Sequence, residues 1–206
     1  MSGIFEYNGS AVVAMAGKEC VAIACDRRLG SNQLQTVSAN FKKVYSVNDK
    51  TLIGYAGLAT DVQTMQNNLR FRLNLYKLRE ECDIQPGMLS NLVGTMLYGR
   101  RFAPWFVSPV VAGLNEKNEP FLSAFDFIGA ACHAKDFVVA GTSCEQLYGV
   151  CEAFWRENMN PDELFETVSQ CLLAATDRDC LAGWGAYVYI QTPTLRIVKT
   201  LKSRMD

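Results

Sequence analysis

A serine, Ser10, stands at the start of the first apolar run of the sequence, directly after Asn8 and Gly9. The next apolar run, CVAIAC, ends in Asp26, so a hydroxyl and a carboxylate lie at the ends of two neighbouring segments. Serine acts as a nucleophile when a nearby base takes its proton, whereas Asn-Gly-Ser is also ordinary turn chemistry. The residue types therefore leave two interpretations open, a nucleophile position and a turn.

The eight cysteines and the single histidine do not form a metal-binding pattern. No Cys-x-x-Cys pair is present, and His133 falls in an expected loop, Gly-Ala-Ala-Cys, without an obvious partner. Most cysteines lie in apolar runs, where a free thiol behaves as a small hydrophobic group. We expect reduced thiols in a protein of the cytoplasm and nucleus, no zinc site, no cofactor and no catalytic role for His133.

The composition is that of one globular domain, residues 1–206, with 49% hydrophobic residues and a net charge of −1. Basic residues are interspersed with acidic ones, so we expect no nucleic-acid partner. No apolar run reaches the roughly 18 residues of a membrane span, so no membrane insertion is expected. The N-terminal stretch MSGIFEYNG lacks a basic start and an apolar core, which indicates no secretion signal.

The first half of the sequence predicts strands and then two helices. Short apolar runs predict four strands, at 11–15, 20–25, 42–47 and 51–57. From Thr60 to Cys82 apolar residues recur every three or four positions, which predicts a helix capped by Thr60 and Asp61. A second helix is expected from Pro86 to near Gly99.

The second half predicts strands, two helices and two closing strands. The expected strands lie at 107–114, 119–129, 137–141, 186–192 and 195–201. The expected helices run from about 143 to 155 and from Asn160-Pro161, a good cap and first residue, to Thr176. Two helix pairs and two sets of strands favour an α/β (α+β) fold: a four-layer α-β-β-α sandwich of two antiparallel sheets between two helix layers.

Several phrases of the sequence resemble the proteasome beta-type subunits, which belong to the N-terminal-nucleophile hydrolase superfamily. These phrases are VAIACDRRLG, KKVY, GYAGLATD and DRDCLAGWGAYVYI. Others resemble more narrowly one non-catalytic branch of that family: YNGSAVVAM, AGLATDVQT, FRLNLY, DFVVAGT, EQLYG and LKSRMD. The resemblance implies the four-layer fold and assembly into seven-membered rings. Its implied partners are beta-type subunits of the same and the opposite ring, and alpha-type subunits.

The resemblance also implies which positions match the active site of the family. Active members use an N-terminal threonine, whose hydroxyl attacks the peptide carbonyl while its own α-amine acts as the base. The matching positions are Ser10 for the nucleophile, Asp26 for the aspartate, Lys43 for the lysine (with one residue inserted within 29–35), Gly57 for the oxyanion hole, Thr142 for a serine, Asp179 for an aspartate and Ala182 for a second serine. A cation, where bound, would contact the backbone carbonyls of Thr176, Asp179 and Ala182.

Two of these positions depart from the active pattern, since a serine replaces the threonine and Ala182 replaces a serine. If Gly9 stays attached, the nitrogen of Ser10 is an amide and cannot serve as a base near neutral pH. We therefore expect a non-catalytic structural subunit that supports ATP- and ubiquitin-dependent protein degradation, with no catalytic residue of its own. The alternative is a serine-type N-terminal-nucleophile peptidase that matures by cleavage at Gly9–Ser10. A free-standing binding module is a third, weaker reading.

Other readings of single residues stay open. Asp26 and Arg27 could form a turn salt bridge in any protein. The aromatic stretch 102–109, FAPWFVSP, and the tail 201–206 are candidate interface segments, since aromatic residues and arginine are favoured at interfaces. The stretch 102–109 could equally be core at a passage from helix to strand.

Overall fold

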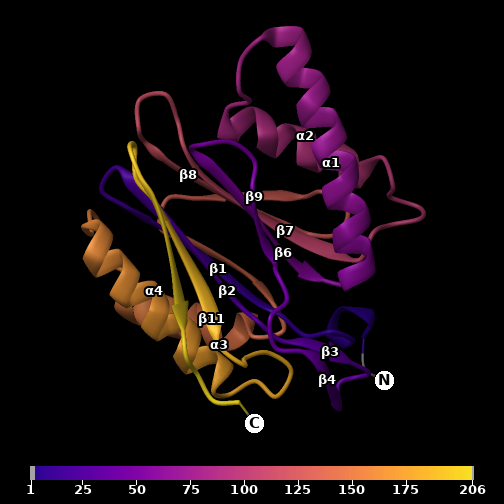
Figure 1. The fold of residues 1–206 in the computed structure, drawn as a ribbon, viewed down its shortest axis with the longest axis vertical. Coiled ribbons are helices and arrows are strands. Elements are labelled where there is room, and N and C mark those ends of the chain that lie inside the picture. Colours follow the sequence, from indigo (N-terminus) through magenta and orange to yellow (C-terminus); the bar gives the residue numbers. More distant parts are fainter. Residues whose placement is uncertain (1–2, 206) are drawn as a thin grey trace.

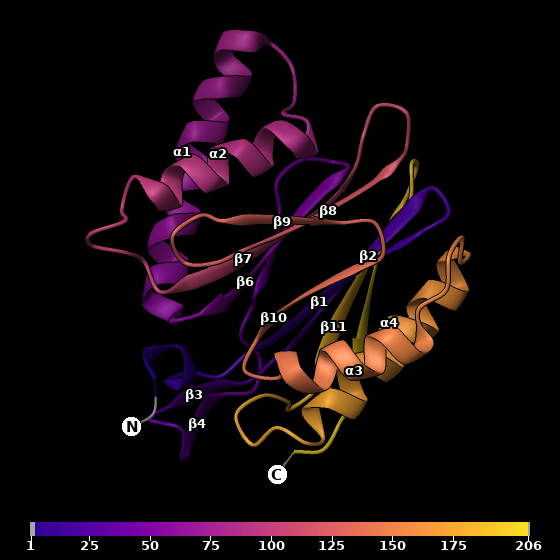
Figure 2. The ribbon, with the colours of Figure 1, turned by 180° about the vertical axis from the view of Figure 1, so that it is seen from behind.

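The computed structural model describes residues 3–205 and has four layers (Figure 1). One antiparallel sheet has the strand order β10 (Phe137–Gly141), β1 (Ala11–Gly17), β2 (Cys20–Asp26), β11 (Ala186–Gln191) and β12 (Arg196–Leu201). The other has the order β5 (Val44–Ser46), β6 (Thr51–Gly57), β7 (Val107–Leu114), β8 (Pro120–Phe125) and β9 (Ala131–Ala134). The helices are α1 (Ala59–Glu80), α2 (Pro86–Tyr98), α3 (Cys144–Phe154) and α4 (Pro161–Thr176). Figures 1 and 2 show α1 and α2 outside the second sheet, and α3 and α4 outside the first.

The two sheets pack face to face, which explains why the central strands are apolar on both faces. Along β1 the side chains of Val13 and Met15 pack towards α3 and α4, whereas Val12 and Ala14 pack between the sheets. Successive side chains of a strand point to opposite faces, so a strand covered on both sides needs an uninterrupted apolar run. The predicted four-layer fold is therefore confirmed.

Most predicted elements agree with the structure to within a few residues. The strands β6, β7 and β10 have the predicted bounds, and α4 ends at Thr176 as expected. At the start of α4 the Asn160 amide and the Glu163 carboxylate form a capping box. The side chain of Glu163 accepts the Asn160 N–H at 3.0 Å. The helix start predicted from Asn160 and Pro161 is therefore confirmed, and the Glu163 cap adds to it.

Four expectations about local structure are wrong. The N-cap of α1 is Leu58, without a side-chain hydrogen bond, because the Asp61 carboxylate accepts the backbone N–H of Phe106 at 2.9 Å. The strand expected at 42–47 is reduced to Val44–Ser46. His133 lies in a strand, β9, rather than in a loop, and its ring contacts that of Phe121.

The fourth is the strand expected at 119–129, which ends at Phe125. The expected turn within 29–35 is present at 32–34, where it joins an unpredicted hairpin of β3 (Leu29–Ser31) and β4 (Gln35–Ser38). A short 3₁₀ helix, η1 (Ile4–Glu6), precedes β1 and was not predicted.

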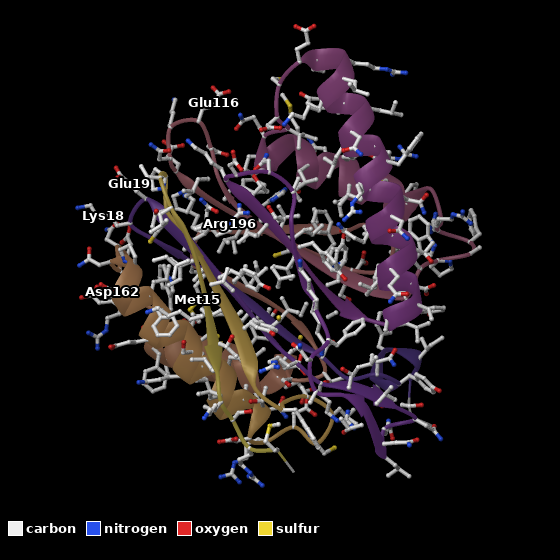
Figure 3. All side chains as sticks on the ribbon, viewed as in Figure 1. Met15, Lys18, Glu19, Glu116, Asp162 and Arg196 are labelled. Carbon is white, nitrogen blue, oxygen red and sulfur yellow. The ribbon has the colours of Figure 1, made fainter. Side chains whose placement is uncertain are left out.

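A side chain from the last strand ties the two sheets together at one edge. Arg196, labelled in Figure 3, lies on β12 and donates to the Ser46 hydroxyl at 2.5 Å. It also donates to the Asn48 carbonyl at 2.7 Å and to the Gln191 side chain at 2.7 Å. Three polar contacts from one guanidinium hold β12 next to the turn that follows β5.

The stretch 102–109 divides between the two roles considered for it. Phe102 is 94% exposed at the tip of the loop after α2, whereas Val107 is fully buried at the start of β7. Of the two arginines before Phe102, Arg101 lies over the exposed rings of Tyr98 and Phe102, and Arg100 lies over the partly buried ring of Trp105. The tail residue Met205 is exposed, and Asp206 lies outside the described residues.

All eight cysteines are free thiols: three are exposed, four are buried and Cys144 is intermediate. Burial raises the pKa of the Cys20 thiol to about 11 and that of Cys25 to about 12. We expect a thiol reagent at pH 8 to modify the exposed group at least about tenfold faster than the buried group, because thiolates react and buried thiols are protonated and shielded. The exposed group is Cys82, Cys132 and Cys180, and the buried group compared with it is Cys20, Cys25 and Cys151. Cys171 is also buried but is left out of the comparison, because its hydrogen bond with Cys151 lowers its pKa.

Peptide mass mapping of the native full-length chain checks this expectation, with denatured chain as the control in which all sites react. Equal modification of the two groups in the native chain would contradict the burial of Cys20, Cys25 and Cys151.

No helix within residues 3–205 combines the length and apolar character that crossing a bilayer requires.

Candidate functional site

Ser10 is buried at the start of β1, between the ends of three strands. Its hydroxyl accepts the backbone N–H of Gly57, the last residue of β6, at 3.4 Å. Its own N–H donates to the Thr142 hydroxyl at 3.3 Å, and its carbonyl accepts the Thr142 N–H at 2.7 Å. The fold thus places Ser10, Gly57 and Thr142 together although the sequence separates them widely.

Asp26 and Lys43 form a buried ion pair that contacts the backbone on both sides of Ser10, at Ala11 and Gly9. The Lys43 ammonium lies 2.5 Å from the Asp26 carboxylate, and both side chains are at least 96% buried. Three backbone N–H groups also donate to this carboxylate, those of Ala11 at 2.9 Å, Arg28 at 3.2 Å and Gly183 at 3.2 Å. A buried charge is tolerated when it is paired and fully hydrogen-bonded, and this site meets that condition.

The partner of Asp26 is therefore not Arg27, as a simple turn salt bridge would require. The guanidinium of Arg27 lies over the ring of Tyr187, 4.9 Å from its centre. The lysine has a second acceptor, the carbonyl of Gly9, at 3.2 Å. Lys43 therefore links the charge of the site to the residue that precedes the nucleophile position.

Asp179 binds the residues that follow β10, of which Thr142 contacts Ser10. Its carboxylate accepts the hydroxyls of Thr142 at 2.7 Å and Ser143 at 2.5 Å, and the backbone N–H of Leu181 at 2.9 Å. Ala182 is nearby in the same loop, but its methyl group packs in the core beside α4 and offers no hydrogen bond. The other six positions matched from the sequence thus lie around Ser10.

The residues before Ser10 are ordered by Asn8, which sequence reasoning treated as a turn residue. Its amide donates to the Gly30 carbonyl at 2.8 Å, and its side-chain oxygen accepts the Ala59 N–H at 2.9 Å. Gly9 follows with φ +69°, and a Cβ there would meet the Leu181 carbonyl oxygen at 2.1 Å. Asn8 therefore fixes the path of the chain by its two hydrogen bonds. Gly9 is suited to its position because only glycine tolerates that backbone conformation and that close approach.

The N-terminal segment also fills part of a cavity beside Ser10. The ring of Phe5 packs against those of Phe106 and Phe127, with centroids 5.7 and 5.6 Å away. A cavity of about 480 Å³ remains next to it, lined in part by Phe5, Gly57 and Thr142. Cys144 also lines it, and its pKa is raised to about 11, by burial first and by the nearby Asp179 carboxylate second.

Two further residues that sequence reasoning did not single out hold the site together. Arg28 is buried, and its guanidinium donates to the Leu181 carbonyl at 2.7 Å and the Gln33 carbonyl at 3.1 Å. Ser143 adds the second hydroxyl on Asp179. The second arginine of Asp-Arg-Arg was a visible signal for Arg28, whereas nothing local distinguishes Ser143.

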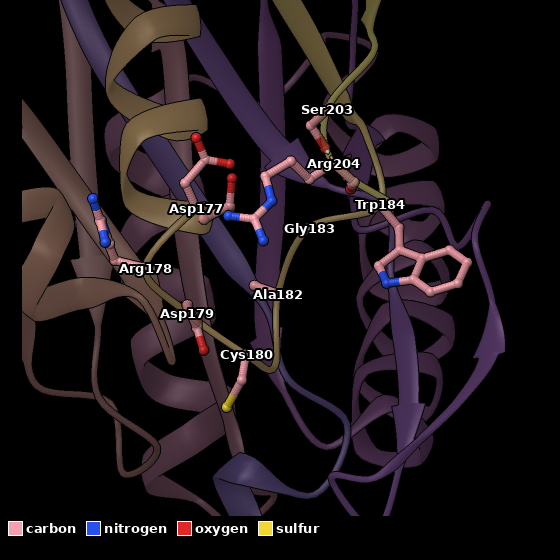
Figure 4. A pocket seen from close by; sticks show the side chains of 10 residues that line it. Asp177, Arg178, Asp179, Cys180, Ala182, Gly183, Trp184, Ser203 and Arg204 are labelled. Atoms are coloured by element: carbon pink, nitrogen blue, oxygen red, sulfur yellow. Dashed lines mark hydrogen bonds between the residues drawn. The ribbon is translucent and has the colours of Figure 1, made fainter. Parts of the chain in front are cut away.

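The loop after α4 borders a second cavity, of about 410 Å³ (Figure 4). It is lined by the cation positions expected from the resemblance, Thr176, Asp179 and Ala182. The Thr176 carbonyl already accepts the Asp179 N–H at 3.2 Å, and the Asp179 carboxylate is held by hydroxyls on the far side. Within residues 3–205 no three side chains of His, Cys, Asp or Glu gather as a metal site. A cation held by these carbonyls stays a prediction.

With Gly9 attached to Ser10, the arrangement within residues 3–205 has a nucleophile position and an oxyanion donor but no base. Within the described residues, the hydroxyl of Ser10 has one hydrogen-bond partner, the Gly57 N–H, which is a donor. Lys43 donates to Asp26 and to Gly9, and the Ser10 nitrogen is an amide. A serine without a base is a poor nucleophile.

The four-layer fold, with a hydroxyl residue at the mouth of β1 beside a buried Asp–Lys pair, has the architecture of an N-terminal-nucleophile hydrolase. Comparison with known proteins narrows this class. The family model described as "Proteasome subunit" matches residues 6–191. The chain belongs to the proteasome subunit family.

Individual relatives are similar along the whole chain. The chain is 57% identical to proteasome subunit beta type-3 of Oryza sativa subsp. japonica and 55% identical to that of Picea mariana, each over 98% of this chain and 99% of the relative. It is 51% identical to proteasome subunit beta type-3 of Saccharomyces cerevisiae over the full length of both. The narrower resemblance to one beta-type branch is thereby confirmed.

Proposed function

We propose that this chain is a non-catalytic structural subunit of the proteasome core particle. It occupies a fixed position in the beta ring and supports protein degradation by the assembly. The observation that carries the proposal is that, with Gly9 attached, no group within residues 3–205 accepts a hydrogen bond from the Ser10 hydroxyl and could serve as its base. The relatives named beta type-3, similar over almost their entire length, support the same role.

The geometry around this bond also opposes its self-cleavage. Cleavage would require the Ser10 hydroxyl to attack the Gly9 carbonyl carbon while a donor stabilises the carbonyl oxygen. The Gly57 N–H that would serve as this donor is directed at the Ser10 hydroxyl instead, at 3.4 Å. The Gly9 oxygen does have a donor, the Lys43 ammonium at 3.2 Å, but within residues 3–205 no acceptor contacts the Ser10 hydroxyl to take its proton, and the side chain of Asn8 fixes the path of the chain before Gly9. The vestigial site thus works as a structural anchor for the N-terminal segment.

The proposed function also implies which subunits this chain contacts and in which compartment it works. Family membership supports assembly with other proteasome subunits. We propose that the neighbours are beta-type subunits of the same and the opposite ring and alpha-type subunits. We also propose that the chain works in the cytoplasm and nucleus, and its eight free cysteines fit these reducing compartments.

In the assembled particle, we expect this chain to retain the Gly9–Ser10 bond and to resist covalent labelling at Ser10. Without an α-amine base, an electrophilic peptide inhibitor should modify Ser10 at less than about 1% of the level seen on a catalytic subunit of the same particle. Intact mass and N-terminal sequencing of the chain, followed by mass spectrometry of inhibitor-treated particles, provide the measurement.

The catalytic subunits of the same sample act as the internal control for labelling. A mature chain that begins at Ser10 and carries the inhibitor there would overturn the structural role. It would establish the alternative, a serine-type N-terminal-nucleophile peptidase. A chain that retains the bond and stays unlabelled excludes that alternative.

A further inference from the structure

The pair Asn8–Gly9 has a chemical reactivity that is separate from its role as an anchor. It is the only Asn-Gly pair in the sequence. In such a pair the backbone nitrogen of the glycine attacks the side-chain carbonyl carbon of the asparagine, and glycine has no side chain to obstruct the ring closure. The new C–N bond forms as ammonia leaves, which gives a succinimide ring. Water then opens the ring to aspartate or isoaspartate, so the pair is a candidate modification site.

The fold fixes the side chain of Asn8 at both ends of its amide group. The amide nitrogen donates to the Gly30 carbonyl at 2.8 Å, and the amide oxygen accepts the Ala59 N–H at 2.9 Å. The backbone carbonyl of Asn8 also accepts the Gly30 N–H at 2.9 Å. Ring closure requires the side chain to rotate towards the Gly9 nitrogen, and that rotation breaks both side-chain hydrogen bonds. The docked segment therefore opposes the reaction.

The nucleophilic nitrogen is fixed as well. Gly9 is buried, its φ is +69°, and the Leu181 carbonyl lies where a Cβ would stand. The nitrogen attacks after it loses its proton to base from the solvent, and a buried backbone amide meets the solvent only when the structure opens locally. Burial of Gly9 and the two bonds of Asn8 thus act on the same reaction.

The segment before Asn8 has few buried contacts. Ile4 and Tyr7 are 43% and 42% exposed. The main apolar contact is the ring of Phe5, which packs against those of Phe106 and Phe127. Figures 1 and 2 show the segment at one end of the molecule, beside β3 and the start of α1. Segments of this kind open at a free energy well below that of global unfolding.

We propose that Asn8 is a deamidation site, which the docked N-terminal segment protects and which reacts when the segment detaches. The product does not fit the docked position. A carboxylate has no donor for the Gly30 carbonyl, so two acceptors would face each other where a hydrogen bond was. Isoaspartate also adds a methylene group to the backbone before Gly9. The reaction therefore makes detachment of the segment permanent.

The rate of deamidation in the native and the unfolded chain tests the protection. Full-length chain is incubated at neutral pH with and without urea and then digested with trypsin. The peptide 1–18 contains no other asparagine, so mass spectrometry of this peptide reports on Asn8 alone. We expect the native chain to react at least about tenfold more slowly, because only the open form reacts. Equal rates would overturn the proposal.

A variant of Ala59 tests the hydrogen bond to the side chain of Asn8. Ala59→Pro removes the N–H that the Asn8 amide oxygen accepts. Proline is favoured at the first position of a helix, and the preceding Leu58 is already extended, with φ −73° and ψ 120°. We expect the native variant to deamidate at least about threefold faster than wild type, because the open form is more populated.

The matched control is Ala59→Ser, which keeps the N–H and should react at the wild-type rate. Circular dichroism establishes that both variants are folded. A folded Ala59→Pro variant that reacts as slowly as wild type would refute protection by this bond. If that variant does not fold, the comparison of native and unfolded wild-type chain still decides the proposal.

The variant Asn8→Asp tests whether the product stays detached. Chymotrypsin cleaves after Phe5 and Tyr7 when the segment is free, and cleavage follows the population of the open form. We expect cleavage at least about fivefold faster than in wild type. The control Asn32→Asp changes an exposed residue of the β3–β4 turn in the same way and should leave the rate unchanged. Equal cleavage of the two variants would show that the product docks again.

The inference rests on one part of the proposed function, the retained bond between Gly9 and Ser10. The two fail in different ways. A peptide 1–18 that is present in chain from the particle but deamidates equally fast when native and unfolded overturns only the inference. A chain from the particle that begins at Ser10 has no such peptide, and that result overturns the proposed function together with the inference.

Discussion

Replacing Lys43 with methionine is expected to lower the free energy of unfolding of the full-length chain by about 3–5 kcal/mol. The Lys43 ammonium lies 2.5 Å from the Asp26 carboxylate, and both groups are shielded from water. Methionine has a similar length but no charge, so the carboxylate would stay buried with only backbone N–H donors. Urea unfolding, followed by circular dichroism, measures the change.

The neighbouring residue provides the matched control. Lys42 is exposed and its ammonium lies over the ring of Tyr45, so Lys42→Met should change the unfolding free energy by less than about 0.5 kcal/mol. The double variant Asp26→Asn/Lys43→Met should recover part of the loss, because it removes the unpaired charge. Similar small losses for Lys43→Met and Lys42→Met would show that the buried pair does not stabilise the fold.

Replacing Gly141 with alanine is expected to destabilise the chain by about 3 kcal/mol or more. Gly141 ends β10 with φ +112°, a conformation that L side chains rarely adopt. A Cβ at this position would meet the carbonyl oxygen of Ser10 at 2.1 Å. That oxygen also accepts the N–H of Thr142, so it cannot move without breaking the contact between β1 and β10.

Gly149 is the control for this substitution, since it lies within α3 and a Cβ there meets no atom within 4 Å. Gly149→Ala should leave stability unchanged or raise it by up to about 1 kcal/mol, because alanine favours helix. Thermal unfolding of both variants provides the comparison. A Gly141→Ala variant as stable as wild type would refute the close approach of β1 and β10 at Ser10.

Local patterns in the sequence were sufficient to predict the order of the main elements. The period of three to four residues in α1 and the unbroken apolar run of β6 are properties of neighbouring residues, so they can be read without the fold. The weak elements escaped prediction for the same reason. The strand β9 contains three exposed residues, and the β3–β4 hairpin has no buried apolar alternation.

The start of α1 shows how tertiary contacts override a local signal. Asp61 sits where a capping residue would be expected, but its carboxylate serves the backbone N–H of Phe106 in a distant loop. Asp61 could cap the backbone N–H groups at the start of its own helix, but its carboxylate instead fixes the backbone just before β7. No pattern around Asp61 distinguishes the two uses.

The sequence by itself determined the family resemblance, the four-layer fold class and the positions around Ser10 that match an active site. It also identified the two departures from the active pattern, Ser10 and Ala182. These conclusions rest on residue types and spacing, which are visible in one dimension.

Only the tertiary structure decided what these positions do to one another. It paired Lys43 with both Asp26 and the Gly9 carbonyl, directed the Gly57 N–H at the Ser10 hydroxyl, and anchored the residues before Ser10 through Asn8. Hydrogen bonds and burial depend on distances between segments far apart in the chain, and those distances exist only once the sheets have packed.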